Sequence, residues 1–403
     1  MIRLLALILF LSLLTPVSAK NKPPPLPAWL YKKLEKTELL ISKKSYQQAE
    51  ENLKEILAKV KTKSYGQAIT LRSLSSLYAI NSQYKKASNT LSKCIALNIL
   101  PETQQQQALL NLGQLYMATE QYTKAIKTLE PWLAEDSNSD AASAELNALV
   151  ANAYAQLKRY RKALPYIKKA ITQSKKPIES WYQLNLALYY ELENYTSAAD
   201  VLKTLVRLYS DKKQYWTQLS SVYQQLKQYK KALSIQQLAY KKKLLNSEKE
   251  ILELANLFLY TGAPYKSAKL LDHELKKKNI KHTSKNWETL ANSWRMAKEF
   301  KFAINALETA SKLDSKGNLY QQLGTIQASQ EEWNNAVSSL NKAISKGGLK
   351  NKGSTYLLLG MSYFELNNTK QAEKSFRQAT QYSKSKKEAF QWIEYIKTTN
   401  QES

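Results

Sequence analysis

Residues 318–346 read NLYQQLGTIQASQEEWNNAVSSLNKAISK and contain two short amphipathic segments separated by a polar turn at residues 329–332. Residues suited to one buried face recur at spacings of three and four in both segments: Tyr320, Leu323, Gly324 and Gln327, then Trp333, Ala336, Leu340 and Ala343. This spacing is typical of helices that bury one face. The stretch therefore predicts two α-helices joined by a short turn.

One part of this pattern, an alanine preceded by a bulky ring three residues earlier, recurs along the chain. Ten alanines hold the position, 33 to 38 residues apart: Ala49, Ala87, Ala125, Ala163, Ala198, Ala232, Ala268, Ala303, Ala336 and Ala372. The earlier residue is tyrosine in seven cases, Phe300 and Trp333 in two, and Thr369 in the last. A period of this length predicts stacked helix pairs, an all-α repeat architecture, instead of one globular core.

Small residues indicate where helices approach closely. Gly113, Gly324 and Gly360 each lie twelve residues before a repeat alanine, where a missing Cβ would let a neighbouring helix come near. Cys94, the only cysteine, lies seven residues after Ala87, where several other repeats hold a second alanine. We expect its thiol to be buried and unreactive, and no disulfide can form within the chain.

The repeated positions hold, in order, a large residue, a leucine, a small residue, a tyrosine, the alanine, a large apolar residue and a second alanine. This order resembles the tetratricopeptide repeat. Four units carry most of it: Leu109, Leu112, Gly113, Tyr116, Ala125 and Leu129; Trp216, Leu219, Tyr223, Ala232 and Ala239; Trp287, Leu290, Ala291, Ala303, Leu307 and Ala310; Tyr356, Leu359, Gly360, Tyr363, Ala372, Phe376 and Ala379. The resemblance covers residues 28–382. It implies an α-solenoid, a right-handed superhelix of about ten helix pairs, whose first helices line a concave groove.

Two repeat units depart from this order, and a further segment follows the last repeat. Lys36 and Thr37 stand where the first unit should hold apolar and small residues, and Asp272 stands where the seventh should hold a large apolar one. The register of these two units stays open. Residues 383–403 follow the last repeat, and we expect a capping helix there with apolar contacts from Phe390, Trp392 and Ile393.

Residues 1–19 have the pattern of a secretory signal peptide. Arg3 precedes the apolar stretch 4–14, and Val17, Ser18 and Ala19 offer a cleavage site after Ala19. An uncleaved membrane anchor is the alternative, but the stretch is shorter than the ~20 apolar residues that span a bilayer. We therefore expect export to the periplasm of a Gram-negative bacterium. Residues 20–27 are rich in proline and are expected to form a short extended spacer.

The chain is strongly basic, with 60 Lys and Arg against 33 Asp and Glu and a net charge of +27. Seven of the basic residues are arginines, and nucleic-acid binding is not expected because arginines are so few. Lysines concentrate on second helices and the links after them: Lys230 and Lys231, Lys241, Lys242 and Lys243, Lys276, Lys277 and Lys278, and the segment 384–387. They are read either as a solvated convex surface or as a surface with weak attraction to anionic lipid or polymer or to acidic protein partners.

The sequence lacks the components of a reaction centre. His273 and His282 are the only histidines, and their spacing does not suit a metal site. The acidic run 135–140 lacks the ligand alternation and glycine of a calcium loop. We expect no enzyme activity, no metal and no cofactor.

Binding of a partner in the concave groove is the remaining class of function. First helices turned inward would present polar and aromatic side chains that can hold the backbone of an extended segment. The candidates are Gln114, Asn152, Gln183, Tyr190, Gln214, Gln224, Tyr260, Asn292, Arg295 and Gln321. The alternative for each is that it only solvates an empty wall. The sequence predicts a scaffold or adaptor that binds a protein or peptide; the alternative is an envelope-assembly or polysaccharide-export scaffold whose basic face contacts lipid or polymer.

The run also resembles the periplasmic tetratricopeptide proteins that accompany TonB–ExbB–ExbD energy-transduction systems. Residues 215–245, YWTQLSSVYQQLKQYKKALSIQQLAYKKKLL, and residues 254–271, LANLFLYTGAPYKSAKLL, carry most of this resemblance. It implies a helper of TonB-dependent transport that contacts a component of that system. The sequence does not indicate an oligomeric state.

Overall fold

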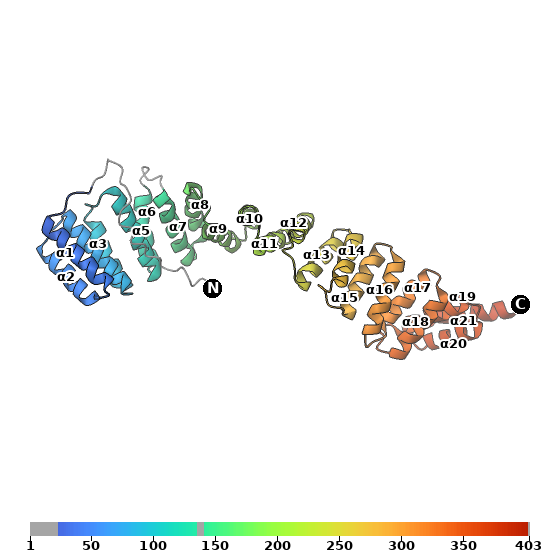
Figure 1. Ribbon diagram of the computed structural model, residues 1–403. Helices are drawn as coiled ribbons and strands as arrows, with labels where there is room; N and C mark the ends of the chain where they lie inside the picture. The colour runs from blue at the N-terminus through green and yellow to red at the C-terminus, as the bar shows by residue number, and fades with distance from the viewer. Residues whose placement is uncertain (1–22, 135–140, 402–403) are drawn as a thin grey trace. The chain divides into compact units, whose positions relative to one another are not determined.

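The computed structural model describes residues 23–134 and 141–401, and in this part of the chain it contains 21 α-helices and no strand (Figure 1). Twenty helices form ten consecutive pairs: α1 Ala28–Ser42 and α2 Tyr46–Lys59, α3 Tyr65–Ile80 and α4 Tyr84–Ala96, α5 Glu102–Ala118 and α6 Tyr122–Leu133, α7 Ala141–Gln156 and α8 Tyr160–Gln173, α9 Glu179–Glu191 and α10 Tyr195–Leu208, α11 Lys213–Gln225 and α12 Tyr229–Lys241, α13 Glu248–Tyr260 and α14 Pro264–Lys276, α15 Ser284–Met296 and α16 Phe300–Leu313, α17 Asn318–Ser329 and α18 Trp333–Lys346, and α19 Lys352–Glu365 and α20 Thr369–Ala379. The prediction of an all-α solenoid of ten helix pairs is confirmed.

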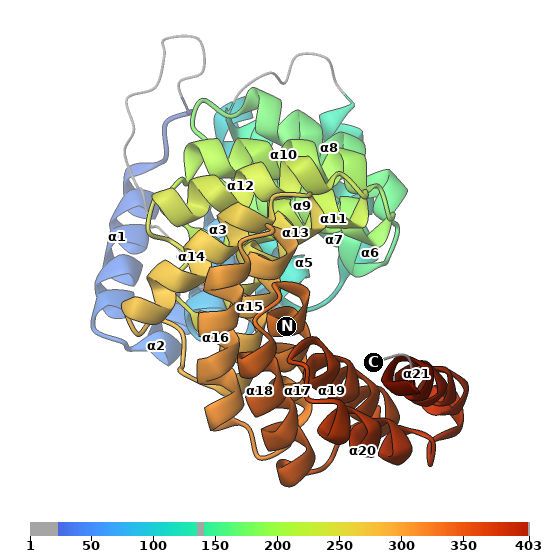
Figure 2. The same cartoon turned by 90° about the vertical axis from the view of Figure 1, so that its right-hand side faces the viewer.

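The chain divides into two compact units, residues 1–208 and 209–403. The first holds the five pairs α1 to α10, and the second holds the five pairs α11 to α20 and the last helix, α21 Ser383–Gln401. Within each unit every helix packs against the next one along the chain, so the pairs stack in sequence order (Figures 1 and 2).

The repeat alanines lie at the centre of this packing. All ten are 0% exposed. An added Cβ at Gly324 would lie 2.7 Å from Leu340 Cγ, and one at Gly360 would lie 2.6 Å from Phe376 Cε1. At Gly113 it would lie 2.9 Å from Leu129 Cδ1. The expected close approach of helices at these glycines is confirmed, because such distances leave no room for a side chain.

All ten first helices end in the same kind of turn, in which one residue has a left-handed backbone with φ between 53° and 77°. These residues are Lys44, Ser82, Glu120, Lys158, Glu193, Lys227, Gly262, Lys298, Glu331 and Asn367. After α11, Lys227 N donates to Gln224 O at 2.8 Å and Gln228 N donates to Tyr223 O at 2.7 Å. This is the Schellman motif. Glycine is its usual signal in a sequence, and only one of the ten turns has it.

The structure settles the register of the first and seventh units. In the first, Thr37 is buried and acts as the small residue, with its Oγ1 accepting a hydrogen bond from Asn52 Nδ2 at 2.7 Å. In the seventh, Asp272 is partly exposed and pairs with Lys276 at 2.7 Å, while Leu271 and Leu275 fill the core. The apolar positions are therefore present in both units.

Helix α21 packs against α19 and α20 through Ala389, Ile393 and Ile396, which are buried. Trp392 stacks on Phe376 with ring centroids 5.4 Å apart. The expectation for Phe390 was wrong, because its side chain is 49% exposed and lies on the outer side of the helix. The predicted signal peptide at residues 1–19, the start of the spacer at 20–22 and the acidic run 135–140 lie outside the described residues.

Cys94 is buried, and its Sγ lies 3.1 Å from Ala68 O. Burial raises the pKa of this thiol to about 11. The expectation of an unreactive thiol agrees with this setting. Among the described helices, none has the length and apolar character that a membrane crossing requires.

Candidate protein-interaction groove

All ten predicted groove residues lie on first helices. In unit 1 these are Gln114 on α5, Asn152 on α7, and Gln183 and Tyr190 on α9; in unit 2 they are Gln214 and Gln224 on α11, Tyr260 on α13, Asn292 and Arg295 on α15, and Gln321 on α17. None of the ten side chains is fully buried. Only some of them line a common hollow.

The first hollow of unit 2, here called the α11–α13 hollow, has a volume of about 420 Å³. Its lining comes from α11, α13 and the start of α12: Ser221, Gln224, Tyr229, Glu253, Asn256, Leu257 and Tyr260. It brings the predicted residues Gln224 and Tyr260 together. The rings of Tyr229 and Tyr260 form one wall, with centroids 4.2 Å apart, and the hydrogen bond between their hydroxyls raises the pKa of Tyr260.

A second hollow, the α15–α17 hollow, has a volume of about 480 Å³. Its lining is Glu288, Asn292, Arg295, Gln321, Gln322, Thr325 and Ile326, so three predicted residues meet in it. Gln322 Nε2 donates to Glu288 Oε1 at 3.0 Å and links the two helices. Within the described residues, the side chains of Asn292 and Arg295 have no hydrogen-bond partner, so they are available to a ligand.

The remaining predicted residues belong to neither hollow. Gln114 borders a space of about 20 Å³, which is room for little more than one water molecule. Asn152 accepts a hydrogen bond from Gln156 Nε2 at 3.3 Å, and Tyr190 packs its ring edge-on against Tyr195. Gln214 lies on the exposed face of α11 and Gln183 on that of α9. The two hollows of unit 2 therefore define the candidate site.

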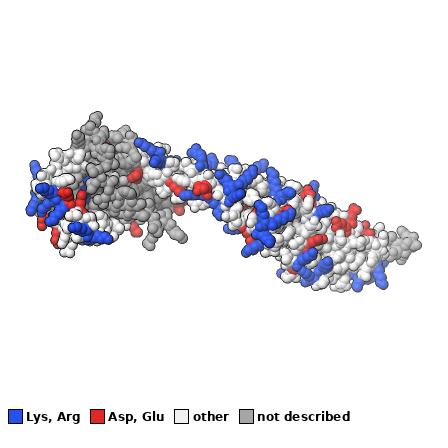
Figure 3. Space-filling model, in the orientation of Figure 1, with Lys and Arg blue, Asp and Glu red and all other residues white. Residues whose placement is uncertain are grey.

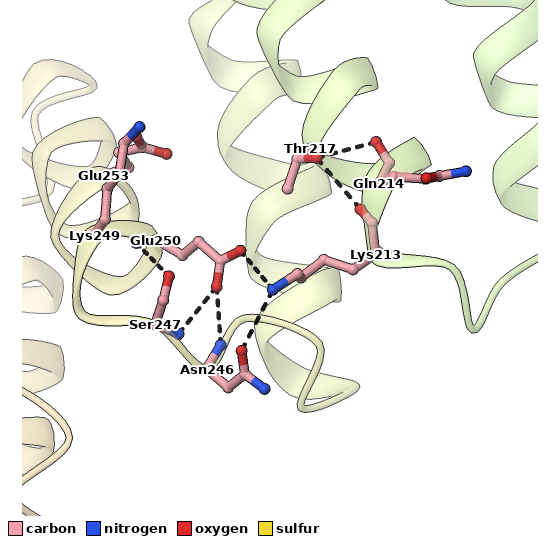
Figure 4. A network of polar contacts seen from close by, with 8 residues as sticks. All are labelled: Lys213, Gln214, Thr217, Asn246, Ser247, Lys249, Glu250 and Glu253. Atoms are coloured by element: carbon pink, nitrogen blue, oxygen red, sulfur yellow. Dashed lines mark hydrogen bonds and ion pairs between the residues drawn. The ribbon is translucent and has the colours of Figure 1, made fainter. Parts of the chain in front are cut away.

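A polar network fixes α13 beside α11 (Figure 4). Lys213 Nζ donates to Glu250 Oε1 at 2.9 Å, and the backbone N–H groups of Asn246 and Ser247 donate to Oε2 at 3.1 and 3.0 Å. Ser247 Oγ accepts from Glu250 N, which completes a capping box at the start of α13. Burial raises the pKa of Glu250, but the hydrogen bonds from Lys213, Ser247 and Asn246 outweigh it and hold the pKa at about 2.

Sequence reasoning selected Gln224 and Tyr260 in the α11–α13 hollow but missed Glu253 and Asn256. Measured from the repeat alanines, Asn256 lies twelve residues before Ala268, whereas Asn292 lies eleven before Ala303. The turn after α13 contains one additional residue, since α14 begins at Pro264 and its ring, Tyr265, follows Gly262 by three positions instead of two. Counting back from the left-handed residue removes this shift. Ser221, Asn256, Asn292 and Thr325 then share one position, six residues before the turn, and all four line the hollows.

The predicted basic residues lie elsewhere. Lys241, Lys242 and Lys243 are exposed at the end of α12, and Lys276, Lys277 and Lys278 are exposed at the end of α14. Cations at these positions complement the negative end of the helix dipole, which gives them a role in stability. Figure 3 shows Lys and Arg side chains gathered over the part of unit 2 that holds α12 to α16. Neither run lines a hollow.

In the described parts of the chain, no three His, Cys, Asp or Glu side chains group closely enough to hold a metal ion. His273 lies beside Glu274 on the surface, and His282 packs edge-on against Trp287. The two hollows are lined mainly by hydrogen-bonding side chains, with a tyrosine pair in one of them, and such side chains suit recognition of a polypeptide.

Comparison with known proteins agrees with the repeat pattern. Models of the tetratricopeptide repeat match residues 110–176, 213–241 and 353–386. Among functionally curated proteins, none matches the chain. A solved structure of MamA protein is 20% identical, with 44% of this chain and 94% of that one covered and a TM-score of 0.37. YrrB, described as a tetratricopeptide protein with an unusual peptide-binding site, is 12% identical over 49% of this chain and 100% of its own, with a TM-score of 0.38.

A tetratricopeptide protein from Parabacteroides merdae ATCC 43184 is 19% identical, covers 64% of this chain and 99% of its own, and has a TM-score of 0.33. Identities this low describe only the fold. The family matches include the segment that carries Tyr223, Tyr229 and Ala232 and the segment that carries Gly360 and Ala372. The chain therefore contains tetratricopeptide repeats, and such repeats serve as scaffolds for protein–protein interaction.

Proposed function

We propose that this chain is a periplasmic adaptor that holds an extended segment of a partner protein against the first helices of unit 2. The observation that carries the proposal is the α15–α17 hollow, where Asn292 and Arg295 lack partners among the described residues and face a space of about 480 Å³. An amide and a guanidinium can hydrogen-bond to the carbonyl groups of a peptide whatever its side chains are.

The α11–α13 hollow supports the same function with different chemistry. Gln224, Asn256 and Ser221 offer donors and acceptors for a backbone, and the two tyrosine rings offer apolar contact. Side chains at the same repeat position thus provide polar contacts in both hollows.

The proposed location rests on the signal-like residues 1–19. The proposed context, TonB-dependent transport with a component of the TonB–ExbB–ExbD system as partner, rests on the resemblance of residues 215–271. Detection of the mature chain in periplasmic extracts, beginning at residue 20, tests the location. Loss of TonB-dependent uptake on deletion of the gene tests the context.

The groove itself is tested by affinity capture of partners from an envelope extract. Asn292→Ala with Arg295→Ala should weaken binding of the specific partner about thirtyfold and lower its recovery accordingly, since two polar contacts worth about 1 kcal/mol each are lost. Lys301→Ala with Asn305→Ala is the matched control, because both of its residues are exposed on the second helix α16. Equal recovery with the two variants would show that the groove assignment is wrong.

The second candidate function is an envelope or polysaccharide scaffold, which the net charge of +27 favours. Binding to an anionic polymer through lysines should weaken steeply as salt rises, whereas groove binding should change little. Charge reversal of Lys241, Lys242 and Lys243 should abolish polymer binding and leave partner capture unchanged.

A further inference from the structure

A third hollow of unit 2 lies at the turn between α11 and α12 and has a volume of about 510 Å³. Its lining is Lys227, Gln228, Tyr229, Lys230, Lys231, Tyr260 and Thr261. Three of these seven residues are lysines and none is acidic. This hollow is here called the lysine–tyrosine hollow, and two of its lysines, Lys230 and Lys231, belong to the second-helix lysines noted in the sequence.

The tyrosine pair is shared with the α11–α13 hollow. Tyr229 and Tyr260 line both spaces, so one wall separates the lysine-lined hollow from a hollow whose polar lining includes two amides and Glu253. Tyr260 is 67% exposed, so its ring is accessible to a ligand. A chain held in the α11–α13 hollow would pass over these rings to reach the lysines.

The lysines of this hollow have no carboxylate to neutralise them. No ion pair involves Lys227, Lys230 or Lys231 among the described residues, whereas Lys213 pairs with Glu250 and Lys276 with Asp272. Lys231 lies over the Tyr223 ring at 5.6 Å, a contact that leaves its charge uncompensated. The hollow therefore has an uncompensated positive charge.

The location of these lysines on the helix also argues against a role in stability. Lys230 and Lys231 occupy the first turn of α12, which begins at Tyr229. Cations near a helix N-terminus are opposed by the helix dipole, unlike those at the C-terminal end such as Lys241. Lys227 additionally holds the left-handed turn position, with φ of 57°, that glycine prefers.

We propose that the lysine–tyrosine hollow binds an acidic peptide segment of the partner, with carboxylates on Lys227, Lys230 and Lys231 and an apolar or aromatic side chain against Tyr260. This inference rests on the proposed function and adds a charge preference to it. Continuity with the α11–α13 hollow favours a peptide over a lipid surface, since a flat membrane would not enter either space.

The test is fluorescence anisotropy with a rhodamine-labelled peptide of repeated Glu-Tyr-Gly triplets, compared with Gln-Tyr-Gly and Glu-Gly-Gly versions. The full chain should bind the first peptide best. Lys227→Gln, Lys230→Gln and Lys231→Gln together should weaken that binding at least about tenfold, because three partly exposed charge pairs are lost. Tyr260→Ala should remove the advantage of the Glu-Tyr-Gly peptide over the Glu-Gly-Gly one.

The control removes the same charge at the C-terminal end of α14, outside the lysine–tyrosine hollow, with Lys276→Gln, Lys277→Gln and Lys278→Gln. An equal loss of peptide affinity in both triple variants would mean that the lysines act only by general electrostatic attraction, and it would overturn the proposal. Competition by phosphatidylglycerol vesicles at the same lysines would likewise overturn it in favour of a membrane. Circular dichroism melting should show no loss of stability in the Lys227, Lys230 and Lys231 variant, whose side chains are exposed. The control variant loses the Lys276–Asp272 ion pair and should melt slightly earlier, so binding is compared at a temperature at which every variant is folded.

Failure of the acidic-peptide proposal can be distinguished from failure of the proposed adaptor function. If the lysine variants leave peptide binding unchanged while Asn292→Ala with Arg295→Ala still loses the partner, the adaptor function stands and the acidic preference falls. If the lysine variants lose the peptide but the groove variants keep the partner, the lysine–tyrosine hollow acts without the α15–α17 hollow.

Discussion

Replacing Glu250 by glutamine should destabilise unit 2 more than its surface position suggests. The carboxylate accepts from Lys213 Nζ and from two backbone N–H groups, and its side chain is 16% exposed (Figure 4). Glutamine keeps an oxygen for one N–H group but presents no charge to Lys213.

The expected loss in the free energy of unfolding follows from the pKa of Glu250. A folded pKa of about 2 against an ordinary value of 4.5 corresponds to about 3 kcal/mol of stability at neutral pH. Lys213 is 41% exposed, and solvent screening brings the expected loss to about 2 kcal/mol. Because the folded pKa is lowered, this stabilisation is complete above pH 4.5 and is lost as pH falls towards 2.

Urea unfolding of the full chain and hydrogen exchange of the α13 amides measure the effect at pH 7 and again at about pH 3, between the folded pKa of about 2 and the ordinary value of 4.5. Glu253→Gln is the matched control, since Glu253 lies on the same helix, is 51% exposed and is 3.8 Å from Lys249. It should cost less than about 0.5 kcal/mol. If Glu250→Gln loses no more than the control, or if its deficit does not shrink on acidification, the assigned role of the network is wrong.

Three further outcomes are expected. Gly262→Ala should lower the free energy of unfolding in urea by about 1 kcal/mol, because a φ of 77° is strained for a residue with a side chain although no atom lies within 4 Å of the added Cβ. Lys298→Gly relieves the same strain and should raise the free energy of unfolding by a few tenths of about 1 kcal/mol. Gly360→Ala should cost about 2 kcal/mol, because its Cβ would overlap the buried Phe376 ring; a neutral result would mean that the helices separate easily. Cys94 should react with a thiol reagent only after unfolding, because burial raises its pKa to about 11, and rapid labelling of the native chain would contradict its placement.

The sequence was sufficient to predict the fold because the same residue pattern recurs in ten repeats. Ala232 alone would mean little, but ten alanines at one spacing identify the second helices, and all ten are 0% exposed. The first-helix ends were harder to foresee. Lys158, Lys227 and Lys298 take the left-handed conformation through the hydrogen bonds of the turn, and lysine carries no sequence signal for that conformation.

The site was predicted in part. Turning the first helices inward correctly brought Asn292 and Arg295 of α15 and Gln321 of α17 to one hollow, and the turns after both helices have the ordinary length. It missed Asn256, where the turn at Gly262 is one residue longer and shifts the count from the repeat alanine. Hollow size could not be foreseen, since it depends on how neighbouring pairs pack, and this is why Gln114 borders almost no free space.

The most direct test of the adaptor role is photocrosslinking in the native host. A photoreactive amino acid in place of Asn292, in the α15–α17 hollow, should trap a single partner at high yield. The same amino acid in place of Asn305, exposed on α16, should trap little. Equal yields from the two positions, or a partner trapped only from Asn305, would contradict a groove on the first helices.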